Sequence, residues 1–267
     1  MIPSQLEKIV EHKRHEIKEK KSLYPEKLLQ KSIFFETTTV SLKKYLLRND
    51  LNGIIAEFKR KSPSRGMINE YASVETTTLG YMQAGASALS VLTDNKFFGG
   101  SNEDLSLARK FNFCPILRKD FIIDPYQIIE AKSIGADAIL LIATLLTKAE
   151  IIAFSELAHS LGLEVLLELH NEEEMDKITT SELIVGVNNR NLHTMTTDIE
   201  TSIRMAEILP SELVKVAESG LRDAQTIQLL KEKGYQGFLI GEYFMHHARP
   251  EKACKKLIQN LRTLVPC

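Results

Sequence analysis

The chain has 267 residues, of which 43% are hydrophobic and 26% are charged, and its formal net charge is -1. These values are typical of a globular protein long enough for one large domain, and the balanced charge gives no basic excess that would indicate nucleic-acid binding. The longest apolar run, residues 138–146, is interrupted by Thr144 and is far shorter than the ~20 residues of a membrane helix. We therefore expect neither a nucleic-acid nor a membrane partner.

An extension of about fifty residues precedes the first predicted strand. It begins with polar and charged residues where a secretory signal would have a continuous apolar core, so a cytoplasmic protein is expected. A charged helix with one apolar stripe is predicted over residues 4–21. It could bind a membrane surface, bind a partner protein or pack on the rest of this chain. Acidic residues alternate with basic ones along it, which favours packing on the rest of the chain. The stripe consists of Leu6, Ile9, Val10 and Ile17.

Eight short apolar runs rich in β-branched residues alternate with helical stretches after the extension. Their nearly continuous hydrophobicity is expected for a parallel sheet whose outer face is covered by helices. The pattern predicts an α/β fold, a (β/α)8 TIM barrel, in which residues 1–267 form one domain and residues 1–50 are a helical extension packed on the barrel. The runs are 53–58, 86–92, 115–118, 136–142, 164–169, 183–187, 213–217 and 237–240.

Two of the intervening segments carry clear helix-start signals. Asp124 can cap a helix whose first turn contains Pro125, a residue that fits there because its missing N–H would have no partner. Residues 147–150, Thr-Lys-Ala-Glu, match a capping box and predict a helix that ends near Gly162.

Polar residues stand at the carboxyl ends of five of the eight predicted strands, where parallel barrels gather their functional side chains. Two lysines and three carboxylates are thereby directed to one cavity, where their attraction keeps them charged and burial tunes their pKa values. This set suits acid/base catalysis without a metal. The residues are Glu57 and Lys59, then Arg118, Lys119 and Asp120, then Glu168, then Asn188, Asn189 and Arg190, and finally Glu218, Ser219 and Gly220.

Glu57 and Lys59 are two residues apart at the end of the first run. Side chains of a strand repeat their direction every second residue, so this acid and this base point to the same face.

A phosphate site is predicted where the last two strands end. Ser219, Gly220 and Gly241 stand there, and residues without a Cβ let backbone N–H groups approach an anion. Lys59 and Ser62 reach the same place from the first loop. The alternative is that both glycines merely serve turns.

Neither the cysteines nor the histidines indicate a metal centre. Cys114, Cys254 and Cys267 form no C-x-x-C pattern, and the pair His246 and His247 lacks acidic or cysteine partners at ligand spacing.

Taken together, eight segments in their order and spacing resemble indole-3-glycerol phosphate synthase, a family of the tryptophan pathway. The resemblance covers nearly the whole predicted barrel, and an N-terminal extension is also a trait of this family. The segments are IIAEFKRKSPSRG, LSVLTDNKFFGGSNEDL, PILRKDFIIDPYQIIEA, GADAILLI, LLELH, VGVNNRNL, VAESGL and FLIGEYFM.

The resemblance implies closure of the indole ring of 1-(2-carboxyphenylamino)-1-deoxyribulose 5-phosphate with loss of carbon dioxide and water, and it implies no cofactor. Lys119 of LRKDF is similar to the general acid that protonates the ribulose carbonyl. Glu168 of LLELH is similar to the general base that serves the later dehydration. A monomer is compatible with the resemblance, which leaves the oligomeric state open.

The resemblance also implies roles for the other polar residues at the strand ends. Glu57 and Lys59 match the remaining acidic and basic residues of the catalytic site, and the choice of acid/base pair for dehydration stays open. Asn188 and Arg190 resemble residues that hold the substrate and the catalytic carboxylates. Glu218 resembles a residue that forms another polar wall of the catalytic site. We count Asn188 and Glu218 as catalytic and Arg190 as substrate-binding.

Ser62, Ser219, Gly220 and Gly241 are similar to the residues of the phosphate cradle, with Ser219 also counted as substrate-binding. In one departure, Glu242 follows Gly241 where some relatives carry a small hydroxyl residue. A backbone N–H contact to phosphate is therefore expected there in place of a side-chain contact.

Residues 97–100, Phe-Phe-Gly-Gly, resemble a mobile loop near the anthranilate ring, and the alternative is a hydrophobic anchor under a long loop. Two other functions compete with the main prediction. In a Schiff-base aldolase, Lys119 would be the nucleophile. A non-catalytic barrel that binds sugar phosphates would have no need of the full set of Glu57, Lys59, Lys119 and Glu168.

Overall fold

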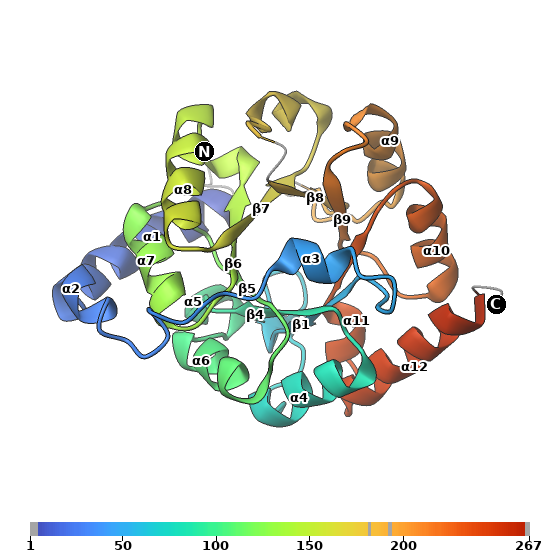
Figure 1. The fold of residues 1–267 in the computed structure, drawn as a ribbon, viewed down its shortest axis with the longest axis horizontal. Coiled ribbons are helices and arrows are strands. Elements are labelled where there is room, and N and C mark those ends of the chain that lie inside the picture. The colour runs from blue at the N-terminus through green and yellow to red at the C-terminus, as the bar shows by residue number, and fades with distance from the viewer. Residues whose placement is uncertain (1–4, 181–182, 192–193, 265–267) are drawn as a thin grey trace.

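The computed structural model describes residues 5–180, 183–191 and 194–264. Within these residues, eight parallel strands close into a barrel and helices surround it (Figure 1), so the predicted (β/α)8 fold is confirmed. Each strand pairs with its sequence neighbours around the barrel, and the last strand closes on the first. The barrel strands are β1 (Ile54–Phe58), β4 (Ala88–Leu92), β5 (Ile116–Lys119), β6 (Ala138–Ile142), β7 (Glu164–Leu169), β8 (Ile184–Asn188), β9 (Val214–Glu218) and β10 (Gly237–Ile240).

The helices lie outside the strands and at the two ends of the barrel. Asp124 and Thr147 cap their helices as predicted, and Thr147 forms the capping box with Glu150. Between β7 and β8, the described residues form a 3-10 helix in place of the expected α-helix. The elements are α1 (Gln5–Leu23), α2 (Glu26–Leu29), α3 (Leu42–Leu46), α4 (Val74–Ala84), α5 (Asn95–Phe98), α6 (Asn102–Phe111), α7 (Pro125–Ser133), η1 (Ala143–Leu145), α8 (Lys148–Ser160), η2 (Glu172–Lys177), α9 (Glu200–Ile208), α10 (Ala224–Glu232), α11 (Glu242–Met245) and α12 (Pro250–Leu264), with a small hairpin of β2 (Lys61–Ser62) and β3 (Gly66–Met67).

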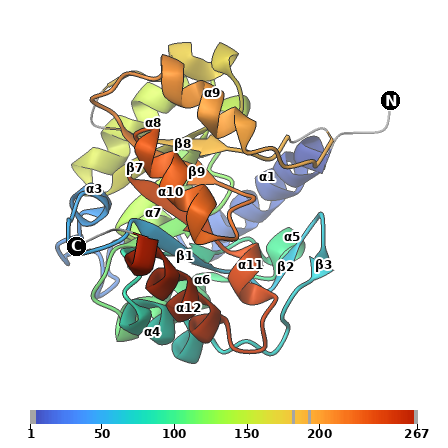
Figure 2. The ribbon, with the colours of Figure 1, turned by 90° about the vertical axis from the view of Figure 1, so that its right-hand side faces the viewer.

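The core has two layers because successive side chains of each strand point to opposite faces. In β1, Ile54 and Ala56 pack in the outer layer between strands and helices, whereas Ile55 packs in an inner layer to which every barrel strand contributes. Leu42 and Leu46 of α3 belong to the inner layer and close one end of the barrel. Figure 2 shows α3 on one side of the strands and α1, α5 and the β2–β3 hairpin on the opposite side. The opposite end is therefore free to hold a site.

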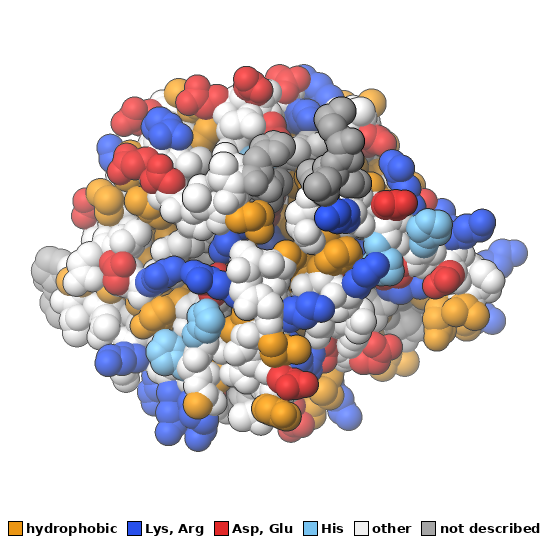
Figure 3. Space-filling view, turned by 180° about the vertical axis from the view of Figure 1, so that it is seen from behind, with side chains coloured by type: hydrophobic (Ala, Val, Ile, Leu, Met, Phe, Trp, Pro, Cys, Tyr) orange, Lys and Arg blue, Asp and Glu red, His pale blue; other side chains and the backbone are white. Residues whose placement is uncertain are grey.

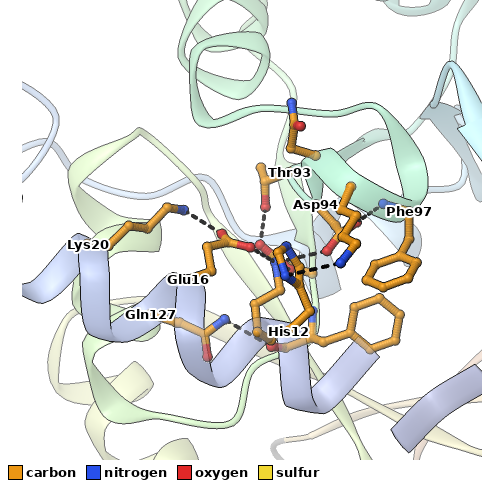
Figure 4. A network of polar contacts seen from close by, with 12 residues as sticks. His12, Glu16, Lys20, Thr93, Asp94, Phe97 and Gln127 are labelled. Carbon is orange, nitrogen blue, oxygen red and sulfur yellow. Dashed lines mark hydrogen bonds and ion pairs between the residues drawn. The ribbon is translucent and has the colours of Figure 1, made fainter. Parts of the chain in front are cut away.

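Helix α1 contributes a buried cation to the wall of the barrel. Lys13 is fully buried, and its Nζ lies 3.0 Å from Asp94 Oδ2, 3.0 Å from Asp120 Oδ1 and 2.9 Å from Glu16 Oε2. Figure 4 shows Glu16, Thr93 and Asp94 around this cluster. Burial alone would lower the pKa of Lys13, but the three carboxylates raise it, so the side chain keeps its charge. These ion pairs join the extension to the carboxyl ends of β4 and β5.

The assignment of residues 1–267 to a single domain stays a prediction. None of the helices in the described part of the chain has both the length and the apolarity to span a membrane.

Replacing Lys13 by methionine tests how much the buried cation contributes. Lys13→Met leaves Asp94 and Asp120 buried without their cation, and breaking such a pair typically costs about 3–5 kcal/mol. We expect this loss in the free energy of unfolding measured by urea denaturation. The exposed Lys18 on the same helix provides the control Lys18→Met, for which a change within about 0.5 kcal/mol is expected. Equal stability of both variants would contradict the assigned role of the cluster.

Candidate active site

A cavity of about 860 Å³ opens at the carboxyl ends of the strands, opposite α3. Figure 3 views this face and shows Lys and Arg side chains around its middle. Every residue to which we assigned a catalytic, substrate-binding or phosphate-binding role lines the cavity, so the structure brings these residues together. These residues are Glu57, Lys59, Ser62, Lys119, Glu168, Asn188, Arg190, Glu218, Ser219, Gly220 and Gly241.

Lys119 stands between two carboxylates at the centre of the site. Its Nζ donates to Glu218 Oε2 at 2.6 Å and to Glu168 Oε2 at 2.8 Å. Asn188 Nδ2 donates to the other oxygen of Glu168 at 3.1 Å. Strand register explains this convergence, because Glu168 pairs with Gly186 in β8 and Asn188 pairs with Glu218 in β9.

Burial and the neighbouring charges shift the pKa values of Lys119, Glu168 and Glu218 in different directions. Burial alone would lower the pKa of Lys119, but Glu168 and Glu218 raise it, so the ammonium form persists. Burial would raise the pKa of Glu168, but Lys119 and His170 hold it well below its usual range. Burial and the nearby Glu168 carboxylate raise the pKa of Glu218 to about 8, although Lys119 opposes this shift. These shifts favour, at neutral pH, a charged Glu168 beside a protonated Glu218.

Glu57 and Lys59 form a second ion pair on the opposite wall. Lys59 Nζ lies 2.7 Å from Glu57 Oε1, and Ser90 Oγ donates to Glu57 Oε2 at 3.4 Å. The predicted common direction of the two side chains is therefore what the structure shows. Glu57 is buried in β1.

Two glycines, which have no side chain, leave room for the carboxylates of Glu218 and Glu57. A Cβ on Gly186 would lie 2.5 Å from Glu218 Oε1, and a Cβ on Gly241 would collide with the side chain of Glu57. From the sequence, Gly241 was expected to serve phosphate alone, and Gly186 was not predicted, because a strand glycine carries no chemistry of its own.

The loop after β9 has an unusual backbone. Ser219 and Gly220 both have positive φ, of 67° and 82°, which is uncommon for a residue with a side chain. Asn189 Nδ2 donates to Ser219 O at 3.1 Å and supports the turn. Successive backbone N–H groups of such a turn can form a concave site suited to an anion.

Glu242 faces the arginines of this wall. Its carboxylate lies 3.2 Å from Arg190 Nη2 and 3.2 Å from Arg65 Nε, and Arg222 Nη2 lies at 4.0 Å. Arg190 also donates to Ser64 Oγ at 3.1 Å. Burial would raise the pKa of Glu242, but Arg65 and Arg190 lower it, so the carboxylate stays charged. Arg65, Arg222 and this pairing were not predicted, since they depend on three loops meeting.

Apolar side chains cover the remaining walls. Phe98 lines the cavity and its ring packs 5.9 Å from that of Phe121. Asp94 Oδ1 accepts from the N–H groups of Phe97 and Phe98 and so holds residues 97–100 at the rim. The proposed mobility of this loop stays a prediction. Other apolar lining residues include Leu6, Ile9, Leu92, Leu140, Ile142 and Leu239, of which the two from α1 were not expected in the site.

Three polar residues at the strand ends lie outside the cavity wall or contribute there only in part. Arg118 is fully buried and donates to Gln127 O and to Glu130, towards α7. Asn189 binds Ser202 through its side-chain oxygen. Asp120 lines the cavity but pairs with Lys13. In the described part of the chain, no cluster of three or more His, Cys, Asp or Glu residues has a geometry suited to a metal ion.

The raised pKa of Glu218 predicts a pH-dependent stability. The unfolded carboxyl ionises near 4.5 and the folded one at about 8, so unfolding releases a proton between these values and stability falls as pH rises. Glu218→Gln removes this loss. We expect its melting temperature relative to wild type to rise from pH 5 to pH 8.5 by at least about 2–4 °C, which corresponds to ~1 kcal/mol.

Thermal melts across this pH range make the measurement. Glu156→Gln, on the exposed side of α8, is the matched control and should keep a constant offset from wild type. A constant offset for Glu218→Gln as well would refute the raised pKa.

Comparison with known proteins places these observations in one family. A profile of indole-3-glycerol phosphate synthase matches residues 6–257. Enzymes of that name from Bacteroides thetaiotaomicron and Carboxydothermus hydrogenoformans are 46% and 40% identical to this chain; the matches cover 96% and 95% of this chain and 98% and 99% of those enzymes.

Solved structures with lower identity share the fold alone. 3-Hexulose-6-phosphate synthase from Salmonella typhimurium matches with a TM-score of 0.60 at 12% identity, over 79% of this chain and 99% of that one. Thiamine phosphate pyrophosphorylase from Pyrococcus furiosus matches with a TM-score of 0.58 at 16% identity, over 82% and 100%. From the family profile and the curated relatives, this chain belongs to the indole-3-glycerol phosphate synthase family, carboxy-lyases of tryptophan biosynthesis.

Proposed function

We propose that this protein closes the indole ring of 1-(2-carboxyphenylamino)-1-deoxyribulose 5-phosphate, releasing carbon dioxide and water to give indole-3-glycerol phosphate. Family membership supports this reaction. The observation that carries the chemistry is Lys119 Nζ, held 2.6 and 2.8 Å from two buried carboxylates inside the cavity. We also propose a cytoplasmic location, in keeping with the biosynthetic family to which the chain belongs.

In the first step, Lys119 gives a proton to the ribulose carbonyl oxygen while the ring carbon that bears the carboxylate attacks the carbonyl carbon. The new carbon–carbon bond leaves a positive charge that the nitrogen shares. Loss of carbon dioxide returns the electron pair of the broken bond to the ring and restores its aromaticity. The raised pKa of Lys119 keeps this acid charged when substrate arrives.

Dehydration then uses one residue from each wall, Lys59 and Glu168. The nitrogen lone pair expels the hydroxyl, to which Lys59 gives a proton, and Glu168 then removes a proton from the adjacent ring carbon. Two protons are given and one is taken, so each turnover takes up one proton from water, as replacement of a carboxylate by neutral products requires. The 2.8 Å contact lets Glu168 return its proton to Lys119 and reset the pair.

The phosphate lies, in this proposal, against Ser62, Ser219, Gly220 and Gly241, with Lys59 as a further cation. The positive φ of Ser219 and Gly220 supports backbone N–H contacts. The aromatic ring then faces the apolar wall around Phe98. This orientation directs the reacting carbon towards Lys119.

The two competing functions have less support. A Schiff-base aldolase needs an uncharged lysine, but the two carboxylates beside Lys119 stabilise its ammonium form. A non-catalytic binder has no use for the second ion pair of Glu57 and Lys59.

Lys119→Ala should lose about 10²–10⁴-fold in kcat, because a positioned proton donor is removed while the remaining contacts to the substrate persist. Indole fluorescence measures turnover, and KM should change much less than kcat. Lys255→Ala, at an exposed position of α12, is the control and should match wild type. Unchanged turnover in Lys119→Ala would disprove its role as the acid, and inactive wild-type protein would disprove the reaction itself.

Glu242→Gln tests the anion site. Removing the carboxylate frees Arg65 and Arg190 for the phosphate, and it removes the repulsion between the Glu242 carboxylate and the phosphate. We therefore expect KM to fall about five-fold, equivalent to ~1 kcal/mol, at nearly constant kcat. Inhibition by inorganic phosphate should tighten in parallel. A higher KM would mean that Glu242 instead orients the arginines.

A further inference from the structure

A histidine with a largely covered side chain directly follows the strand that carries the proposed general base. His170 comes two residues after Glu168, its side chain is only 8% exposed, and its Nε2 lies 3.2 Å from Glu168 Oε1. It is not among the residues that line the cavity. Glu168 therefore has Lys119 on one carboxylate oxygen, and Asn188 and His170 on the other.

The imidazole is held on its other side by two 3-10 helices. Nδ1 lies 3.3 Å from Thr144 Oγ1 in η1 and 3.8 Å from Glu174 Oε2 in η2. Glu174 accepts from Thr144 Oγ1 at 2.6 Å and from the backbone N–H of His170 at 2.7 Å. Lys177 of η2 donates to Ala143 O and Leu146 O at the η1 segment. These bonds fix the ring relative to the barrel.

The charged groups near the ring are mostly acidic. Glu168 of β7 and Glu174 of η2 contact it, Glu218 of β9 lies further off, and Lys119 of β5 lies across Glu168. Burial alone would lower the pKa of His170, but Glu168, Glu174 and Glu218 raise it. The cationic form is therefore favoured, and it supplies a second positive charge beside Glu168.

We infer that His170 is a positioning residue for this enzyme: it fixes one oxygen of Glu168 so that the other stays beside Lys119 and faces the reacting atoms. This inference rests on the proposed function for the role of Glu168. The contact also makes ionisation of Glu168 easier, because a nearby cation stabilises the carboxylate. Neither effect involves contact between His170 and the substrate.

Kinetics of two variants separate these effects. His170→Ala removes both the contact and the charge, so kcat should fall about 10- to 100-fold, the range for losing one close contact to a charged group, with little change in KM. The acid limb of the kcat–pH profile should move to higher pH, since Glu168 then ionises less readily. His170→Gln restores a donor near Nε2 without the charge, so it should recover part of kcat but keep the shifted limb.

The exposed His15 of α1 provides the matched control His15→Gln, which should behave as wild type. A loss of kcat in His170→Ala without a shift of the acid limb would indicate a merely structural role and overturn the inference. Unchanged kcat would overturn it as well.

A second measurement needs no turnover and so separates this inference from the proposed reaction. Titration of His170 by proton NMR should give a lower pKa in Glu168→Gln than in wild type, because the contacting carboxylate has gone. An unchanged pKa would show that the two groups do not interact and would overturn the inference. Inactive wild-type protein with the expected NMR shift would instead refute the proposed reaction alone.

Discussion

The ion cluster of Lys119 with Glu168 and Glu218 is the constraint on which the rest of the site depends. Two buried carboxylates repel each other and lose hydration, so they can stand together only with a cation between them or with one of them protonated. The structure uses both, with Lys119 at 2.6 and 2.8 Å and with a raised pKa for Glu218. Gly186 leaves the space that Glu218 needs. Charge, proton distribution and packing are thus set by one arrangement.

The N-terminal extension adds a second buried ion cluster next to the first. Asp120 follows Lys119 in the chain and pairs with Lys13 of α1, while Asp94, which also pairs with Lys13, caps α5 at the cavity rim. One buried lysine therefore links the strand end that carries Lys119 to the segment that carries Phe98. Because the ions are desolvated, their mutual geometry is tightly specified, which suits a site that must hold proton donors and acceptors at fixed distances.

Two walls of the cavity carry different charged groups. The wall formed by β5, β7 and β9 holds the Lys119 cluster, and the wall near β1 and β10 holds Lys59, Glu57 and the arginines facing Glu242. His170 supports the first wall from behind, through η1 and η2. The short 3-10 helix between β7 and β8, where an α-helix was expected, brings Glu174 close enough to hold this ring.

The fold and most site residues could be predicted from the sequence, because they depend on local rules. Period-two alternation directs Ile55 and Glu57 inward, and strand ends in a parallel barrel must meet. The sequence by itself thus determined the barrel, the convergence of lysines and carboxylates, and the family to which they point. Only the tertiary structure decided the partners: Lys13 with Asp94 and Asp120, Glu242 with the arginines, and His170 with Glu168. These pairs join segments that no local pattern relates, and their charge states follow from burial, which exists only once the chain has folded.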